Sequence, residues 1–347
     1  MCENEGGPPR LVPEAAIRID EMVPLEPVDE LSITVLMENQ SDLLLPSGGP
    51  VERPSLPSLP TIPVSTFDQP GPDVLIAEHG FSALVEVSKG GERREVLFDT
   101  GVSPNGMTEN MSRLDVDPKD VSAVVMSHGH LDHAGGLDGF IRAVGRRNLP
   151  VLLHPDFWLQ RRITPPGGSP WELPATSRSA LEGAGFEIVE SRQPSFLLDR
   201  SLLITGEVDR TTTFEQGFPI HEALRDGEWT PDPLILDEQA MVMHLRGKGL
   251  VILTGCGHAG IVNIARYARK LTGVDQVHAI IGGFHLTGGL FEPIIGPTVD
   301  ALTELGPELL MPGHCSGWQA QQALAARLPD AYVHPSVGTK LRLSSAA

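Results

Sequence analysis

Several features are scarce in this sequence, and each scarcity excludes a class of protein. Only three of the 347 residues are cysteine, too few for a disulfide scaffold, which indicates a reduced, cytoplasmic protein. Basic residues are outnumbered, because 26 Lys and Arg face 45 Asp and Glu and leave a net charge of −19. So acidic a chain repels a phosphate backbone, and we expect no nucleic-acid partner. No run of about eighteen apolar residues and no signal-peptide core occur, so no membrane association is expected.

Proline is concentrated at the start of the chain. Thirteen of the 31 prolines lie in residues 1–72. Residues 1–30 are acidic and predict a flexible arm, and residues 31–39 have the aliphatic, β-branched texture of a strand. The Pro-, Gly- and Ser-rich stretch 41–72 excludes helix, because each proline removes a donor and fixes φ. It is either a linker or an active-site flap or loop, and the flap is favoured because ordered chain resumes on both sides.

From residue 73 onward, short apolar runs alternate with helical patterns. Strands are expected at 82–87, 95–98, 121–126, 151–153, 201–204, 240–245, 251–253 and 277–281. Helices are expected at 136–144, 261–271, 298–305 and 318–328. Because no linker interrupts this mixture, we expect residues 31–347 to form a single α/β domain.

The strongest functional signal is the segment SHGHLDHAGG at 127–136, which follows a strand-like run. Side chains two residues apart on an extended loop point the same way, so His128, His130 and Asp132 should converge. A turn would then bring His133 beside them. Three imidazoles and a carboxylate so close in sequence can begin two neighbouring first-row metal sites. A solvated polar loop is the alternative, and the density of the cluster disfavours it.

The pattern His-x-His-x-Asp-His after a strand resembles the signature of the metallo-β-lactamase superfamily. The resemblance implies an αβ/βα sandwich of two mixed β-sheets flanked by helices, with metals where strands end. It also implies further ligands, for which VILTGCGHAG supplies His258 and LLMPGHCSG supplies His314. LFDTG supplies Asp99, whose implied role is to orient a ligand histidine by accepting a ring N–H.

Five further segments resemble one branch of this superfamily, the dihydropteroate-synthase-like branch related to the archaeal pterin–ribofuranosylaminobenzene phosphate synthase. In order they are EHGFSALVE, TGEVDRTTTFE, DEQAMV, GCGHAGIVN and GGFHL. This resemblance covers residues 73–340 and implies the layout of the fold and site. The chemistry transfers less well, because one fold supports many reactions.

One departure from the superfamily pattern concerns the ligand between the third and last histidines. Relatives carry an Asp or Cys there, at a strand end, whereas this chain has Phe284-His285-Leu286. His285 is therefore a metal ligand, a general acid for the leaving group, or a buried structural residue. Occupancy of the second metal site depends on which of these holds.

Other candidates each have a structural alternative. Glu78 and His79 precede a strand and either face the pocket or cap a turn. Arg210 either meets a substrate anion or pairs with a local acid. Asp237 and Glu238 are expected to be solvated at the surface.

Two cysteines and several histidines are interpreted as structural. Cys256 and Cys315 adjoin expected ligands but fall outside the ligand positions of the superfamily, so we expect buried packing residues. The isolated histidines are expected to be structural or exposed; these are His154, His221, His244, His278 and His334.

The complete metal-binding set predicts one or two divalent ions, with zinc expected and manganese or iron as alternatives. The set comprises His128, His130, Asp132, His133, His258 and His314. It predicts a metal-dependent hydrolase that uses a metal-bound hydroxide on a small substrate, aromatic or heterocyclic, such as an activated ether or ester. Asp132 and His285 are the expected catalytic residues.

The alternative function is a pterin-type synthase that joins a dihydropterin to an aminobenzene ribosyl phosphate. Such an enzyme should turn several basic residues toward its pocket to hold phosphate. The sequence offers only weak candidates for this role, which are Arg210, Arg246 and Lys248. The expected partner is a small-molecule substrate, with a homo- or hetero-oligomer left open.

Overall fold

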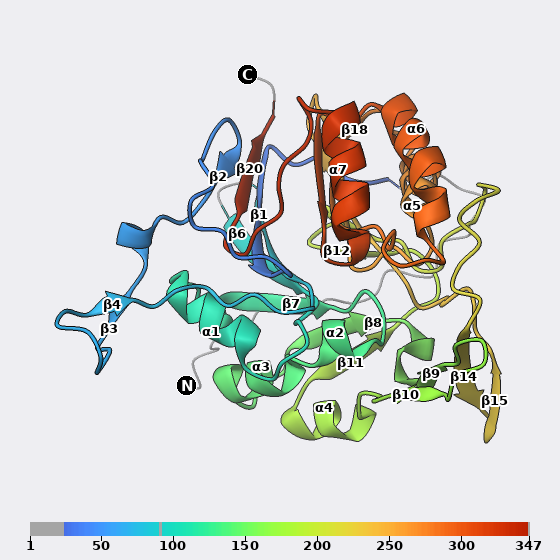
Figure 1. The fold of residues 1–347 in the computed structure, drawn as a ribbon, viewed down its shortest axis with the longest axis horizontal. Helices are drawn as coiled ribbons and strands as arrows, with labels where there is room; N and C mark the ends of the chain where they lie inside the picture. The colour runs from blue at the N-terminus through green and yellow to red at the C-terminus, as the bar shows by residue number, and fades with distance from the viewer. Residues whose placement is uncertain (1–23, 90–91, 346–347) are drawn as a thin grey trace, which may run out of the picture.

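The computed structural model describes residues 24–89 and 92–345, in which two mixed β-sheets pack face to face (Figure 1). The first sheet has the strand order β11-β8-β7-β6-β5-β1-β20-β2. Its strands are β1 (Glu30–Met37), β2 (Val51–Glu52), β5 (Ser82–Lys89), β6 (Glu92–Phe98), β7 (Val121–Val125), β8 (Pro150–Leu153), β11 (Glu187–Glu190) and β20 (Lys340–Ser344).

The second sheet has the order β12-β13-β16-β17-β18-β19. Its strands are β12 (Ser195–Leu197), β13 (Leu202–Ile204), β16 (Met241–Leu245), β17 (Gly249–Thr254), β18 (Val277–Gly283) and β19 (Leu309–Gly313). Two small sheets lie outside the sandwich. They contain β9 (Arg161–Ile163), β10 (Trp171–Leu173), β14 (His221–Arg225) and β15 (Glu228–Pro231), and β3 (Thr61–Ile62) with β4 (Gly71–Pro72).

Helices cover the outer face of each large sheet. The first sheet is covered by α1 (Gly106–Arg113), α2 (Leu131–Ala134), α3 (Leu137–Val144) and α4 (Arg178–Ala184). The second is covered by α5 (Ile261–Thr272), α6 (Ile295–Leu305) and α7 (Gly317–Arg327). Short 3₁₀ turns are η1 (Leu56–Ser58), η2 (Pro118–Asp120), η3 (Pro155–Trp158), η4 (Glu292–Ile294) and η5 (His314–Ser316). The expected αβ/βα sandwich is confirmed.

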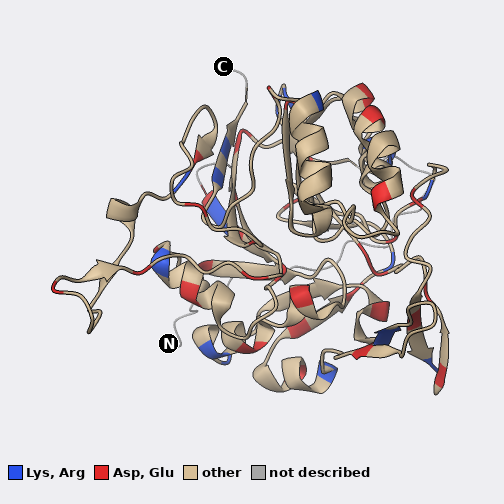
Figure 2. Cartoon of the chain, viewed as in Figure 1, with Lys and Arg blue, Asp and Glu red and all other residues tan. Residues whose placement is uncertain are grey.

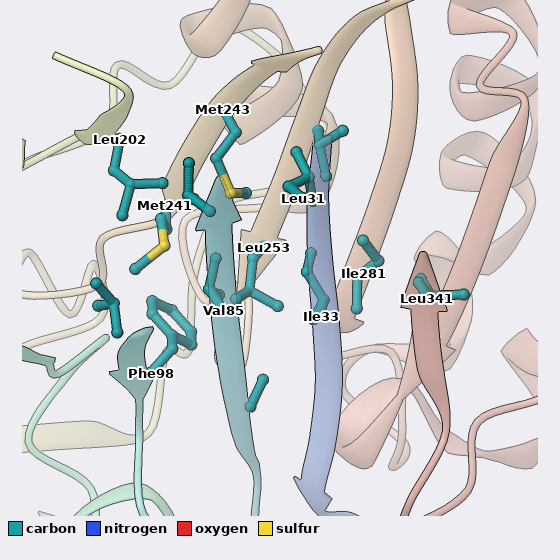
Figure 3. Close-up of a cluster of buried hydrophobic side chains, with 14 of the residues drawn as sticks. Leu31, Ile33, Val85, Phe98, Leu202, Met241, Met243, Leu253, Ile281 and Leu341 are labelled. Atoms are coloured by element: carbon teal, nitrogen blue, oxygen red, sulfur yellow. The ribbon is translucent and has the colours of Figure 1, made fainter. Parts of the chain in front are cut away.

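Strand periodicity divides the core into three layers. On β17, Val251 and Leu253 point between the sheets, whereas Leu250 and Ile252 point toward the covering helices. The central layer joins side chains such as Ile33 of the first sheet to those of the second (Figure 3). A fully buried aliphatic side chain contributes about 1.5–3 kcal/mol, so this layer holds the two sheets together.

The expected N-terminal arm needs correction where the structure describes it. Residues 1–23 lie outside the described residues. Val28, by contrast, is fully buried and forms a bridge with Leu245 at the end of β16. The flexible arm was expected to extend to residue 30. Such an arm would end before Val28, because the side chain of Val28 is buried in the core against the second sheet.

The Pro-rich stretch 41–72 runs along the edge of the first sheet and then away from it. Its strand β2 pairs with β20 through Val51 and Leu341, and β3 and β4 form a separate hairpin (Figure 1). Asn39 precedes this stretch and His79 follows it, and their side chains meet with 3.3 Å between Asn39 Nδ2 and His79 Nδ1. Among the described residues, no helix combines the length and apolar character needed to cross a membrane.

Parallel pairing brings the functional segments to one end of the sandwich. β6, β7 and β8 are parallel neighbours in the first sheet, and β17, β18 and β19 are parallel neighbours in the second. The carboxyl ends of parallel strands meet at the same edge of a sheet. The loops that follow these strands therefore face one another across the end of the sandwich.

Candidate metal centre

All six residues expected to bind metal follow strand ends at this end of the sandwich, with Asp132 and His133 in the short helix α2. His128, His130, Asp132 and His133 follow β7, His258 follows β17, and His314 follows β19. The loop after β17 can approach because residue 255 is glycine. A Cβ added to Gly255 would lie 2.2 Å from the Ser127 hydroxyl oxygen, and no side chain fits in that space.

Three imidazole nitrogens form the first donor group. His128 Nε2 lies 3.0 Å from His130 Nδ1, and His258 Nε2 lies 3.2 Å from the same atom. Two nitrogens bound tetrahedrally to one zinc, each at about 2.0–2.1 Å, are roughly 3.3 Å apart. The three side chains therefore fit a single ion of this size.

The second donor group contains two imidazoles, a carboxylate and a thiol. Asp132 Oδ2 lies 3.2 Å from His314 Nε2 and 3.7 Å from His133 Nε2. Cys256 Sγ lies 3.1 Å from His133 Nε2 and 3.4 Å from His314 Nε2. These four donor atoms all lie within 4.8 Å of one another, a spacing that could hold a second ion.

The two groups differ in their electrostatics. Burial, with help from neighbouring imidazoles, holds the pKa values of His128, His130 and His258 well below the usual range. Burial also lowers the pKa of His133, but the carboxylates of Asp132 and Asp99 outweigh it and raise the value to about 9. The first group therefore consists of neutral imidazoles, whereas the second favours a positive charge.

Hydrogen bonds on the far side of the rings fix most ligand orientations. The Asp99 carboxylate lies 2.7 Å from His133 Nδ1 and also accepts from the backbone N–H and hydroxyl of Ser127. The resemblance implies that Asp99 orients a ligand histidine, and His133 is the histidine that its carboxylate contacts. With Nδ1 engaged by Asp99, His133 Nε2 is the ring nitrogen that faces the donor group and can bind an ion.

Two residues near the start of the chain hold His314, and the sequence did not single them out. Glu38, at the end of β1, accepts the backbone N–H of His314 at 2.7 Å and is buried. Asn39 Oδ1 lies 3.3 Å from His314 Nδ1. Their positions at a strand end were the only available signal.

His221 was expected to be structural or exposed, and it is a buried residue that contacts an expected metal ligand. It is fully buried at the start of β14, and its Nε2 lies 2.9 Å from His130 Nε2. Its Nδ1 lies 3.1 Å from the backbone oxygen of Asp232. His221 thus contacts the outer nitrogen of an expected ligand.

Asp237 and Glu238 were expected at the surface, but both are buried beside the site. Asp237 accepts the backbone N–H of Gly129 at 2.8 Å and pairs with the buried Arg161 at 2.6 Å. Glu238 accepts the backbone N–H of Gly257 at 3.0 Å, and its other oxygen lies 3.4 Å from His128 Nδ1. Burial raises the pKa of Glu238 to about 8, and the backbone N–H groups that the two side chains accept belong to loops that carry expected ligands.

His285 borders the first donor group but belongs to neither the first nor the second donor group. Its ring centroid lies 4.1 Å from that of His258, and its Nδ1 is buried without a hydrogen-bond partner. Its donor nitrogen forms a third group of potential ligands with the thiols of Cys256 and Cys315. His285, Asp99 and His314 all have positive φ, at 46°, 55° and 49°, a conformation that costs side-chain-bearing residues about 1–3 kcal/mol.

A cavity of about 260 Å³ opens beside His258 and His285. Its walls combine aromatic and aliphatic side chains with polar groups in about equal area; the lining residues are Phe214, Glu215, Gln216, Gly217, Pro219, Gly257, His258, Gly260, Phe284, His285, Leu286, Leu290, Phe291 and Ile294. The Phe291 ring meets the His285 ring edge-on with 4.4 Å between centroids. The cavity can therefore hold a small planar molecule next to the first donor group.

The three remaining pocket candidates lie at the rim or behind the site. Glu78 accepts the backbone N–H groups of Val102 and Ser103, so it holds a turn. His79 is largely exposed, with its Nε2 3.8 Å from Asp132 Oδ2. Arg210 donates to the backbone oxygen of His258 at 3.1 Å, which makes it a support for the ligand loop.

Known proteins share this architecture. The family model for the metallo-β-lactamase superfamily matches residues 75–189. The 7,8-dihydropterin-6-methyl-4-(β-D-ribofuranosyl)-aminobenzene-5′-phosphate synthase of Methanocaldococcus jannaschii is 32% identical over 71% of this chain and 83% of its own length. An uncharacterized protein of the same organism is 30% identical over 74% of this chain and 91% of its length.

A solved structure described as a metal-dependent hydrolase of the β-lactamase superfamily has a TM-score of 0.68 and 25% identity. The match covers 91% of this chain and 100% of that chain. Together with the strand-end histidines, these similarities establish that the chain belongs to the metallo-β-lactamase superfamily, in the branch that includes the M. jannaschii synthase.

Proposed function

We propose that this protein is a metal-dependent hydrolase of a small, uncharged aromatic or heterocyclic molecule. The observation that carries the proposal is the contact between the first donor group and the aromatic cavity, since His258 belongs to both. An electrophilic bond held in the cavity would lie next to the ions.

The two donor groups divide the metal-binding work. His128, His130 and His258 would hold one ion, and a second would be held by Asp132, His133 and His314. A divalent ion of the zinc class, when bound, lowers the pKa of a coordinated water to about 7 and polarises the bond under attack. Manganese and iron remain alternatives to zinc on this donor set.

Two side chains of the chain supply the remaining chemistry. Burial would raise the pKa of Asp132, but His133 and His314 outweigh it and keep this carboxyl ionised far below neutral pH. Asp132 is also partly exposed, so it can orient a water molecule that enters from the solvent side. His285 lies between His258 and Phe291, where its ring can donate a hydrogen bond to the leaving group or, in its protonated form, transfer a proton to it.

The charge distribution supports a substrate without phosphate. Among the described residues that line the cavity, none is Lys or Arg. Acidic and basic positions are both spread over the molecule (Figure 2), and the 45 Asp and Glu outnumber the 26 Lys and Arg. Lys340 on β20 already pairs with Glu86. A small-molecule partner is therefore favoured over a nucleic acid.

A pterin-type synthase is the second candidate, and the identity to the M. jannaschii enzyme favours it. That reaction needs basic groups for the ribosyl phosphate. Arg210 is engaged with backbone oxygens, Arg246 pairs with Asp29, and Lys248 lies 3.8 Å from Glu308. None of the three is left to bind phosphate in the cavity, so hydrolysis is the better supported reaction.

The test is a substrate panel applied to purified protein whose metal content has been measured. The panel contains aryl esters, lactams, phosphodiesters, activated aryl ethers, and the paired synthase substrates, a dihydropterin and an aminobenzene ribosyl phosphate. We expect turnover of an aryl ester or aryl ether, lost in His128→Ala and retained in His278→Ala, whose ring lies beside Glu308. Condensation of the synthase pair without hydrolysis of any panel member would replace this proposal with the second candidate.

A further inference from the structure

The thiol of Cys256 occupies a position that packing alone does not explain. Its sulfur lies 3.1 Å from His133 Nε2 and 3.4 Å from His314 Nε2. A nitrogen and a sulfur bound tetrahedrally to one zinc are roughly 3.6 Å apart. The sulfur is therefore at ligand spacing from both histidines, within the tolerance of a site that closes around an ion.

Both histidines turn their Nε2 atoms toward this sulfur. His133 Nδ1 is engaged by Asp99, and His314 Nδ1 lies beside Asn39 Oδ1, so each Nε2 is the nitrogen that can accept. Asp132 adds a carboxylate oxygen to the same point. Potential ligand atoms of four side chains thus converge there, and a metal cation that displaces their protons can bind all four.

The same sulfur also reaches the first donor group. Cys256 Sγ and the donor nitrogens of His128 and His258 all lie within 4.8 Å of one another. Among the described residues, Cys256 is the member common to the clusters of potential ligands. One atom placed at both sites can connect two ions.

We propose that the Cys256 thiolate is a ligand shared by the two metal ions, in the role that the missing strand-end carboxylate would have filled. The inference deepens the proposed function and rests on its metal-binding part. When the ions bind, the S–H bond breaks, the sulfur keeps the electron pair, and the proton passes to solvent. A soft sulfur donor also selects for zinc over manganese.

The neighbouring groups fit this role less well. Cys315 Sγ donates to the backbone oxygen of Cys256 and belongs only to the group with His285. His285 carries one available nitrogen toward the centre and cannot bridge two ions as sulfur does. Cys315 is buried beside Cys256 and therefore provides a matched control.

The experiment is a titration of the metal-free protein with cobalt(II), followed by absorption spectroscopy and by metal analysis. Cys2 is first changed to Ser to remove a third thiol. We expect about two cobalt ions per chain, visible d–d bands, and an intense near-ultraviolet band from sulfur-to-cobalt charge transfer. Cys315→Ser should keep that band, and Cys256→Ser should lose it while circular dichroism shows an intact fold.

A second variant keeps the test decisive if Cys256→Ser folds poorly. Cys256→Asp restores a carboxylate bridge, so it should bind two ions, lack the near-ultraviolet band and bind manganese at least tenfold more tightly than the parent. Cobalt bands without charge transfer, or a band lost in Cys315→Ser alone, would overturn the assignment of Cys256 and leave the hydrolase proposal standing. Absence of any bound cobalt would overturn both.

Discussion

His130 Nε2 lies 2.9 Å from His221 Nε2, and this contact extends from the metal-binding face of His130 into the small sheet. His130 presents Nδ1 to His128 and His258, so its Nε2 carries the proton and donates to His221. His221 Nδ1 in turn donates to the backbone oxygen of Asp232 at 3.1 Å. Each ring then has one donor and one acceptor, a consistent assignment of tautomers.

Removal of His221 should weaken metal binding at the first donor group. In His221→Ala, His130 loses the partner that fixes its ring and tautomer, so we expect zinc affinity to fall about 10–100-fold. His221→Gln keeps an acceptor oxygen and should recover part of the loss. Competition with a zinc indicator dye measures the affinities, and His244→Ala on β16 is the control. Equal affinities in parent and His221→Ala would make the contact incidental.

Asp99 should prove essential for His133 in particular. Asp99→Asn replaces an acceptor with an amide whose N–H₂ group faces the Ser127 hydroxyl and His133 Nδ1, both donors. We expect affinity at the second donor group to fall about 10–100-fold. Unfolding free energy should drop by about 1–3 kcal/mol, since buried donors lose their partner. Asp138→Asn on the exposed face of α3 should change stability by less than about 0.5 kcal/mol.

Substitution of His285 should separate its catalytic role from its backbone strain. If His285 is the proton donor, His285→Ala lowers kcat by about 10²–10⁴-fold and leaves metal content unchanged. His285→Gly should be more stable than His285→Ala by about 1–2 kcal/mol, because glycine relieves the positive φ of 46°. Loss of one ion per chain in both variants would instead identify His285 as a ligand.

Metal removal should destabilise the fold. The ions would join the loops that follow β7, β17 and β19. Because these loops come together only in the folded chain, metal binding stabilises the folded state relative to the unfolded state. At a free-ion concentration 100 times Kd this linkage amounts to about 2.7 kcal/mol per site. We expect dialysis against a chelator to lower Tm by several degrees, with recovery on addition of zinc. In His128→Ala the chelator should have a smaller effect, and an equal effect would contradict the assignment.

Sequence reasoning predicted the central fold because its signals are local. The apolar runs of β5, β7, β16 and β18 carry the strand pattern within themselves, and the expected ligand histidines follow β7, β17 and β19. The short strands β9, β10, β14 and β15 escaped notice because few of their residues are buried and their alternation is weak. Their pairing depends on tertiary contacts.

The supporting residues were missed for the same reason. His221 is 91 positions from His130, and Glu38 is 276 positions from His314. No pattern near either residue marks such a partner. Asp237 and Glu238 were read as solvated because acids before a strand usually are, but backbone N–H groups of Gly129 and Gly257 meet them in the interior.

The position of β1 has a consequence for synthesis of the protein on the ribosome. β1 lies between β5 and β20, with Leu31 opposite Val87 on one side and Leu343 on the other. At roughly 5–20 residues per second, β20 is made roughly 15–60 s after β1. During that interval one edge of β1 has no partner and can pair with other chains. β20 therefore covers this edge of β1 only late in synthesis, and a chain that stops before β20 should aggregate while still nascent.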